Sequence, residues 1–238
     1  MKYQNKVLVV SGVTSGIGMA IAIKFGELGW NVVGLARNKK KLEKLQKHIG
    51  SNFLGLKVNL THEENIINAF NIIDKKFENI DLIVNNAAVF KMEEFYKCSF
   101  SDINTIIDTN LKGVMFSTLE AIKIMKKSRH PSRIINIGSV ASVHGIENQA
   151  IYCASKFGLN GFSEALNQEI IKNNISITTI FPGGVNTPLW NENNPYPGND
   201  IEKILKINDI VEIVEFVSKL EPRIILKNMT IFPSNEWH

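Results

Sequence analysis

The sequence predicts an α/β fold in which helices cover both faces of a doubly wound, parallel β-sheet, giving a three-layer sandwich. Short, continuous apolar runs alternate with longer amphipathic stretches along the 238 residues. Continuous apolar runs are typical of parallel strands that are buried on both faces, and the helical connections between such strands are right-handed. A glycine-rich segment follows the first apolar run, at the point where such folds turn from strand to helix.

The predicted elements alternate along the chain without a repeat or a low-complexity linker, so we expect one domain over residues 1–238. Short polar residues predict the N-terminal caps of two helices, at Ser101 and Asp209. The predicted strands are Val7–Val10, Val32–Ala36, Phe53–Val58, Asp81–Val84, Arg133–Ile137, Ile175–Phe181 and Ile224–Phe232. The predicted helices are Ala20–Leu28, Lys39–His48, Glu63–Phe77, Ser101–Lys127, Ala150–Ile171 and Ile210–Leu220.

The composition is that of a globular protein, with 44% hydrophobic and 21% charged residues. The 27 Lys and Arg exceed the 23 Asp and Glu by only four, which gives no indication of a nucleic-acid partner. The two cysteines, Cys98 and Cys153, lack metal-ligand spacing, and no apolar run is long enough to span a membrane. We therefore expect a cytoplasmic protein with no metal site and no membrane contact.

The glycine-rich segment has the residues of a phosphate-binding loop. Gly12, Gly16 and Gly18 permit a tight turn and a close approach of the backbone, and the following helix N-terminus presents free N–H groups to an anion. A glycine-rich turn without a ligand is the alternative. At the end of the second predicted strand, Ala36 and Arg37 stand where an acidic residue would bind the ribose of NAD. Arg37 instead favours the 2′-phosphate of NADP.

Tyr152 and Lys156 are four residues apart on a predicted helix and therefore share one face. An adjacent ammonium group lowers the pKa of a phenol, so the pair can give a proton to a carbonyl or take one from an alcohol. Ser139 follows the fifth predicted strand and is placed to bind the same substrate oxygen, although a serine there is also a common turn residue.

These motifs together resemble those of the short-chain dehydrogenase/reductase family. The resemblance covers about Val7 to Leu189 and continues more loosely to the C-terminus. Its matching segments are the loop Ser11–Gly18, with Ser for the usual Thr; Asn85–Ala88, with Ala for the usual Gly; Asn110; the Ser139, Tyr152 and Lys156 set; and Pro182–Thr187.

The resemblance implies a Rossmann-like fold with a seven-stranded sheet and an NADP(H)-dependent oxidoreductase that interconverts a carbonyl and a secondary alcohol by hydride transfer. In this role Tyr152 is the general acid/base, and Ser139 orients the substrate oxygen. Lys156 lowers the pKa of Tyr152 and holds the nicotinamide ribose, and Asn110 holds a water that links Lys156 to solvent.

The implied cofactor residues favour NADP(H) over NAD(H) and are Gly12, Thr14, Ser15, Gly16, Ile17, Gly18, Arg37, Asn38, Asn59, Leu60, Asn86, Ala87, Ala88, Tyr152, Lys156, Pro182, Gly183, Val185 and Thr187. Asn59 stands where many members have Asp, but its amide oxygen can accept the same hydrogen bond. The implied substrate residues are Ser139, Val140, His144, Gln149, Tyr152 and Trp190. The Asn- and Pro-rich stretch within residues 188–208 predicts an exposed loop that is either plain surface or a substrate lid.

Two other functions fit the same motifs. One is a regulatory protein that senses NADP with little turnover, and the other is a β-ketoacyl carrier-protein reductase. The C-terminal segment lacks the Gly-Gly pair that many of those reductases have. We also expect a homotetramer or homodimer formed through the two longest predicted helices, Ser101–Lys127 and Ala150–Ile171.

Overall fold

The structure is a computed structural model of the chain, and it describes residues 5–128, 130–192, 194–198 and 200–234. Seven parallel strands form one sheet in the order β3-β2-β1-β4-β5-β6-β7, which confirms the predicted fold class. The strands are β1 (Val7–Ser11), β2 (Asn31–Ala36), β3 (Phe53–Lys57), β4 (Leu82–Asn85), β5 (Ser132–Ile137), β6 (Ile175–Pro182) and β7 (Asn228–Ile231).

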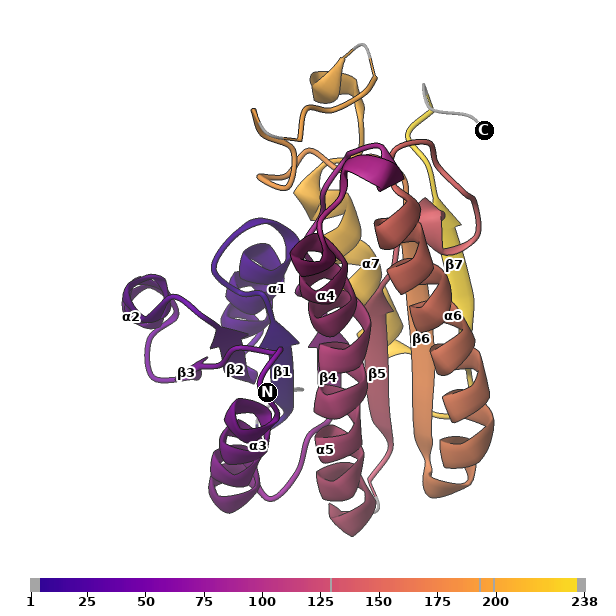
Figure 1. Ribbon diagram of the computed structural model, residues 1–238. Coiled ribbons are helices and arrows are strands. Elements are labelled where there is room, and N and C mark those ends of the chain that lie inside the picture. Colours follow the sequence, from indigo (N-terminus) through magenta and orange to yellow (C-terminus); the bar gives the residue numbers. More distant parts are fainter. Residues whose placement is uncertain (1–4, 129, 193, 199, 235–238) are drawn as a thin grey trace.

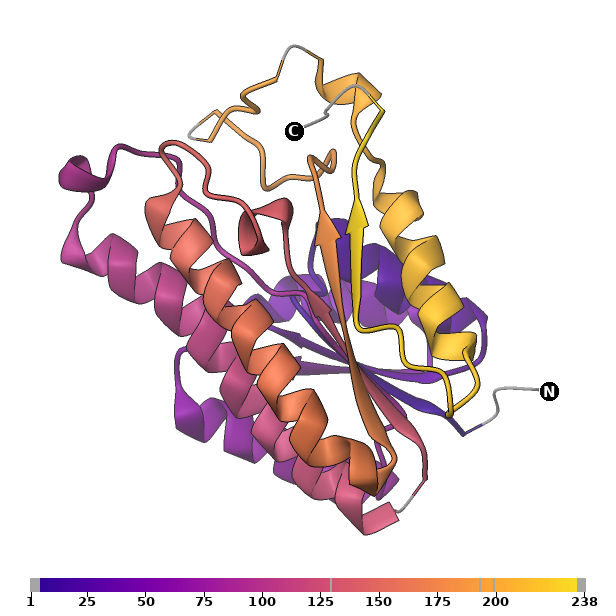
Figure 2. The ribbon, with the colours of Figure 1, turned by 90° about the vertical axis from the view of Figure 1, so that its right-hand side faces the viewer.

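The helices cover both faces of this sheet, as Figures 1 and 2 show. Apolar side chains of α1, α2 and α7 pack on one face, and those of α3, α5 and α6 pack on the other. The helices are α1 (Gly16–Glu27), α2 (Lys39–Ile49), α3 (Glu63–Phe77), α4 (Phe100–Ile107), α5 (Gly113–Ser128), α6 (Ala150–Ile170) and α7 (Ile207–Lys219). None of the described helices is long and apolar enough to cross a membrane.

The strand order reverses at β1, which pairs with β2 on one side and β4 on the other. The chain therefore leaves β1 in one direction for β2 and β3, and later returns on its other side for β4 to β7. Ligands bind such sheets beyond the carboxyl ends of the strands, at this point of reversal. The loops after β1, β4, β5 and β6 all lie at that edge.

Neither of the two predicted N-terminal caps, Ser101 and Asp209, occupies the cap position. Ser99, not Ser101, caps α4, because its Oγ accepts from the backbone N–H of Asp102 (3.1 Å) while the Asp102 carboxylate accepts from the N–H of Ser99 (2.8 Å). In α7, Asp209 lies one turn inside the helix and accepts from the N–H of Lys206 at 2.7 Å. In both helices the carboxylate reaches back to the residue before the helix.

The predicted long helix Ser101–Lys127 is divided in two by a π-helical turn at Asp108–Lys112. Asn110 lies in this turn with its side chain fully buried. Such turns are often found at functional sites because the extra residue per turn redirects a side chain. Here the redirected amide reaches the segment that follows β4.

A buried polar network joins the two central strands to the helices behind them. Asn85 Nδ2 donates to Thr118 Oγ1 at 3.0 Å and to Asn136 Oδ1 at 2.8 Å. Asn136 Nδ2 then donates to Ser163 Oγ at 2.8 Å. The network satisfies polar groups that would be costly to bury unpaired, and it fixes β4, β5, α5 and α6 relative to one another.

Candidate functional site

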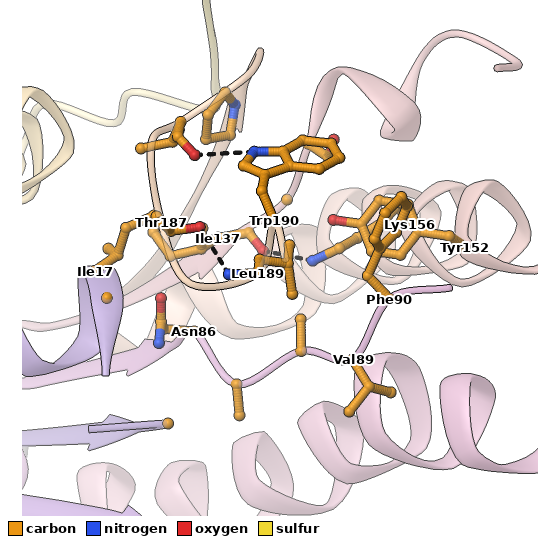
Figure 3. Close-up of a pocket in the computed structure, with 18 of the residues that line it drawn as sticks. Ile17, Asn86, Val89, Phe90, Ile137, Tyr152, Lys156, Thr187, Leu189 and Trp190 are labelled. Atoms are coloured by element: carbon orange, nitrogen blue, oxygen red, sulfur yellow. Dashed lines mark hydrogen bonds between the residues drawn. The ribbon is translucent and has the colours of Figure 1, made fainter. Parts of the chain in front are cut away.

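A cleft of about 740 Å³ opens at the carboxyl ends of the strands. Figure 3 shows it with Ile17 and Asn86 at one end and Tyr152 and Lys156 at the other. The loops after β1 to β6 contribute its walls, together with the start of α6. The cleft is long enough to contain one region rich in backbone N–H groups and a second region with titratable side chains.

The glycine loop forms the first region. Gly12 and Gly16 have φ angles of +74° and +54°, which glycine adopts without strain. A Cβ at Gly18 would lie 2.5 Å from Asn86 Nδ2 and 2.6 Å from the oxygen of Gly12, so no larger residue fits. Ser15 precedes α1 but gives it no side-chain cap among the described residues. The N–H groups of the first turn are therefore available to an anion in the cleft.

Ser11 joins the glycine loop to the segment after β4. Its Oγ accepts from the N–H of Asn86 at 3.0 Å and from the N–H of Ala87 at 3.1 Å. Asn86 Nδ2 donates to the backbone carbonyl oxygen of Ser11 at 3.0 Å. The serine hydroxyl thus holds the two loops together, and a threonine at this position would carry the same hydroxyl.

Tyr152 and Lys156 form the second region and are both buried in α6. Lys156 Nζ lies 5.5 Å from the centre of the Tyr152 ring and donates to the Ile137 oxygen at 2.9 Å (Figure 3). The Ser139 side chain lies near enough to the Tyr152 hydroxyl to lower its pKa. The structure thus brings together the three residues that the sequence predicts as a catalytic set.

The pKa values of this pair differ from the sequence-based expectation. The spacing predicts that Lys156 lowers the pKa of Tyr152, but burial raises the pKa of Tyr152 to about 12, against a lowering effect of the Ser139 side chain. Burial also lowers the pKa of Lys156 to about 8. Removal from water favours the neutral form of each group, so the two shifts have opposite signs. At pH 7 the phenol is protonated and can donate.

Asn110 is not among the residues that line the cleft, and its expected role as the ligand of a water that links Lys156 to solvent stays a prediction. Its Oδ1 accepts from the N–H of Val89 at 2.8 Å, and its Nδ2 donates to the Val89 oxygen at 2.8 Å and to Ser155 Oγ at 3.2 Å. Ser155 Oγ in turn donates to the backbone carbonyl oxygen of Tyr152 at 2.7 Å. Asn110 therefore connects the wall after β4 to the helical turn that contains Tyr152.

The cleft extends to the end of β2. Arg37 is exposed there and lines the cleft, and no carboxylate stands at Ala36 or Asn38. Asn38 does not line the cleft, because its Oδ1 caps α2 by accepting from the N–H of Lys41 at 3.1 Å. Asn59 lines the cleft after β3, and its Oδ1 accepts from the N–H of Thr61 at 3.3 Å.

Three predicted site residues, Gly18, Asn38 and Asn110, do not line the cleft, and the others do. Gly18 is buried under the loop, where it permits close packing rather than contact with a ligand. The predicted residues that line the cleft are Gly12, Thr14, Ser15, Gly16, Ile17, Arg37, Asn59, Leu60, Asn86, Ala87, Ala88, Ser139, Val140, His144, Gln149, Tyr152, Lys156, Pro182, Gly183, Val185, Thr187 and Trp190.

Sequence reasoning missed Phe90 and Tyr196, which line the cleft beside Tyr152 and Trp190. The Phe90 ring packs edge-on against Tyr152, with ring centres 5.0 Å apart, and Trp190 packs edge-on against Phe90 at 5.4 Å. Phe90 and Tyr196 lie outside the motifs that carry the resemblance, and only the folded chain brings them together.

Comparisons with known proteins agree with this geometry. The family model described as short chain dehydrogenase matches residues 6–197. The chain is 33% identical over 189 residues to the 3-oxoacyl-[acyl-carrier-protein] reductase FabG of Escherichia coli K12, covering 79% of this chain and 77% of that protein. It is 30% identical over 244 residues to farnesol dehydrogenase of Aedes aegypti, covering 99% and 98%.

Solved structures give the same result. The closed form of serine dehydrogenase in complex with NADP+ is 28% identical and superposes with a TM-score of 0.89, covering 98% of this chain and 96% of that one. Serine dehydrogenase from Escherichia coli is 27% identical, with a TM-score of 0.86 and coverage of 98% and 100%. From the family match and these relatives, the chain belongs to the short-chain dehydrogenase family of oxidoreductases.

Proposed function

We propose that this protein is an NADP(H)-dependent oxidoreductase that interconverts a carbonyl and a secondary alcohol. The observation that carries the proposal is the buried Tyr152 phenol, which lies beside Ser139 and lines a cleft that also contains the open N-terminus of α1. One end of the cleft suits a pyrophosphate, and the other suits a substrate oxygen.

The described residues fit NADP(H). The N–H groups at the start of α1 would hold the pyrophosphate, and the side chain of Arg37 would pair with the 2′-phosphate. Lys156 Nζ donates one N–H to the Ile137 oxygen, and its other N–H groups would hold the nicotinamide ribose. The bound nicotinamide supplies or accepts the hydride. The similar serine dehydrogenase structure is a complex with NADP+, which supports the same cofactor here.

Side chains of the protein supply the proton and orient the substrate oxygen. In reduction, hydride adds to the carbonyl carbon while the Tyr152 hydroxyl gives its proton to the oxygen, so that C=O becomes CH–OH. The Ser139 hydroxyl, which lies beside Tyr152, orients that oxygen. With its pKa raised by burial, Tyr152 holds a proton to donate at neutral pH.

Cofactor oxidation tests the proposal. Purified protein is given NADPH or NADH with a panel of small and acyl-chain carbonyls, and turnover with NADPH on any of them is the expected result. We expect Tyr152→Phe to bind NADPH as the native chain does and to lose most turnover, because the ring remains and the proton donor is gone. Normal turnover by Tyr152→Phe would remove this residue from the mechanism.

Two alternatives are outcomes of the same panel. NADPH binding without turnover of any carbonyl would indicate a sensor of the NADP state. Turnover confined to acyl-chain β-keto thioesters would indicate a carrier-protein reductase, the activity named for the FabG relatives. We expect neither, because the catalytic set is complete and the rings of Phe90, Trp190 and Tyr196 line the reactive end.

Cofactor preference is tested at Arg37. We expect Arg37→Asp to shift the ratio of kcat/KM values from NADPH toward NADH, since a carboxylate repels the 2′-phosphate and accepts from ribose hydroxyls. Lys40→Asp, on the exposed face of α2, is the matched control for a change of two charges. An unchanged ratio in Arg37→Asp would place the 2′-phosphate elsewhere.

We further propose that the chain forms a homo-oligomer through α5 and α6. Three large apolar side chains on these helices, Met115, Leu119 and Phe157, are 39%, 53% and 46% exposed. Burial of such residues against a second copy removes apolar surface from water. Light scattering of the purified protein gives the mass, and a monomer would contradict this assignment.

A further inference from the structure

The reactive end of the cleft has an aromatic wall. Starting at Tyr152, rings follow one another edge-on: Phe90 at 5.0 Å, then Trp190 at 5.4 Å from Phe90, then Tyr196 at 5.3 Å from Trp190. All four residues line the cleft. Phe90 comes from the segment after β4, whereas Trp190 and Tyr196 come from the loop after β6. The proton donor is thus the first ring of a continuous series.

Hydrogen bonds hold this wall in place. Trp190 Nε1 donates to the Val185 oxygen at 3.1 Å, which Figure 3 shows above the cleft. Asn194, between Trp190 and Tyr196, accepts from the N–H of Met92 at 3.0 Å and donates to the Phe90 oxygen at 3.4 Å. The two loops that supply the rings are therefore tied to each other. A fixed wall selects substrates by shape, because its rings do not have to be ordered on binding.

The reactive end offers little positive charge. Among the described residues that line the cleft, the lysines and arginines are Arg37 and Lys156. Arg37 lies at the end of β2, three strand spacings from β5, or roughly 14 Å at about 4.8 Å per spacing. Lys156 is buried and donates to the Ile137 oxygen. Glu147 adds a carboxylate to the lining near Gln149. A substrate carboxylate or phosphate would meet no arginine there.

We propose that the substrate is an uncharged carbonyl compound that carries an aromatic or branched apolar group, which packs against Phe90, Trp190 and Tyr196. Edge-on and stacked contacts favour such a group over a small polar one. A free carboxylate on the substrate lowers turnover, because the site would remove it from water with no cation to pair with it other than Lys156, which the nicotinamide ribose would occupy. This inference rests on the proposed reductase function, and it separates the protein from enzymes whose substrate is an amino or hydroxy acid.

A matched pair of aryl ketones tests the charge requirement. Para-acetylbenzamide and para-acetylbenzoate have nearly the same shape and differ in one negative charge. We expect kcat/KM with NADPH to be at least about tenfold higher for the amide, the scale on which pockets discriminate such differences. Equal or higher kcat/KM for the carboxylate would overturn the proposal. Turnover of acetone or glyceraldehyde with neither aryl ketone would also overturn it while leaving the reductase function intact.

Variants test the aromatic wall separately from folding. We expect Trp190→Leu and Tyr196→Leu to raise KM for the amide severalfold while NADPH affinity, followed by fluorescence, stays native. The matched control is Tyr96→Leu, an exposed tyrosine outside the cleft, for which KM should not change. His144→Arg adds a cation to the lining and should raise kcat/KM for the carboxylate. Native KM in both wall variants would overturn the role of the wall.

Discussion

We predict that Asn110 positions the segment after β4 that contains Val89, and substitution of Asn110 tests this role. Asn110→Ala removes three hydrogen bonds and leaves the N–H and the oxygen of Val89 without their partner. An unsatisfied buried polar group costs about 1–3 kcal/mol, so two partly buried groups cost about 2–4 kcal/mol. For a chain of this size, about 2–4 °C of Tm corresponds to each kcal/mol, which gives a decrease of about 4–16 °C.

Asn110→Asp gives a sharper test, because it changes one atom type. The retained oxygen still accepts from the N–H of Val89, but the new oxygen faces the Val89 oxygen, to which the native amide donates at 2.8 Å. Burial without a cation raises the pKa of the introduced carboxyl, and its protonated form can donate as the amide does. The folded state then binds the extra proton, so stability relative to the native chain decreases as pH rises from about 4.

Thermal unfolding from pH 4 to pH 8 measures both effects, with kcat/KM as a second readout of the position of Tyr152. Asn104→Ala, at an exposed position of α4, is the matched control and should leave Tm unchanged. A Tm for Asn110→Ala within about 2 °C of native would refute the calculation. So would an Asp variant whose stability, relative to the native chain, is the same at pH 4 and pH 8.

Two further predictions concern charge and packing. Burial lowers the pKa of Lys156 to about 8, so kcat/KM for reduction should fall as pH rises through about 8 and the ammonium loses its proton. Lys156→Arg should lower the maximum rate and abolish this alkaline limb; a limb that stays in place would assign it to another group. Gly18→Ala should cost ~1–3 kcal/mol by overpacking against Asn86, measured by urea unfolding, whereas Gly161→Ala, whose Cβ meets nothing within 4 Å in a single copy of the chain, should stabilise α6 of the monomer by ~0.5–1 kcal/mol. Equal effects of the two substitutions would contradict the packing argument.

The layered fold can be predicted from the sequence because apolar runs and amphipathic stretches alternate regularly along the chain. Continuous apolar runs such as Val7–Val10 can be satisfied only where both faces of a strand are covered, and the structure buries every residue of β1. Parallel strands bring their carboxyl ends to one edge, so the loops that end in Gly18, Ala88 and Ser139 converge without further information. The position of the cleft is therefore a consequence of strand direction.

The orientation of individual side chains does not follow in the same way. Asn110 matches a motif by spacing, but the π-helical turn that buries it arises from packing between α4, α5 and the segment at Val89. The helix cap is different, because Ser99 with Asp102 three residues later is a capping box that the sequence itself contains, and Ser101 has no acid at that spacing. Phe90 and Tyr196 required the folded chain, since nothing in their local sequence relates them.

The pKa values show why a motif predicts which residues lie together more readily than how they change each other's pKa. A lysine one turn from a tyrosine suggests that the ammonium lowers the phenol's pKa, but this argument omits the burial of both groups. In the structure burial dominates, holding the pKa of Tyr152 at about 12 and that of Lys156 at about 8. Environments that move two pKa values apart assign the roles of a pair. Tyr152 stays protonated across the range in which proteins are stable, whereas Lys156 changes charge within it. Under the proposed function, we therefore expect a change of activity near pH 8 to report the charge of Lys156, while the phenol keeps its proton on both sides of that pH.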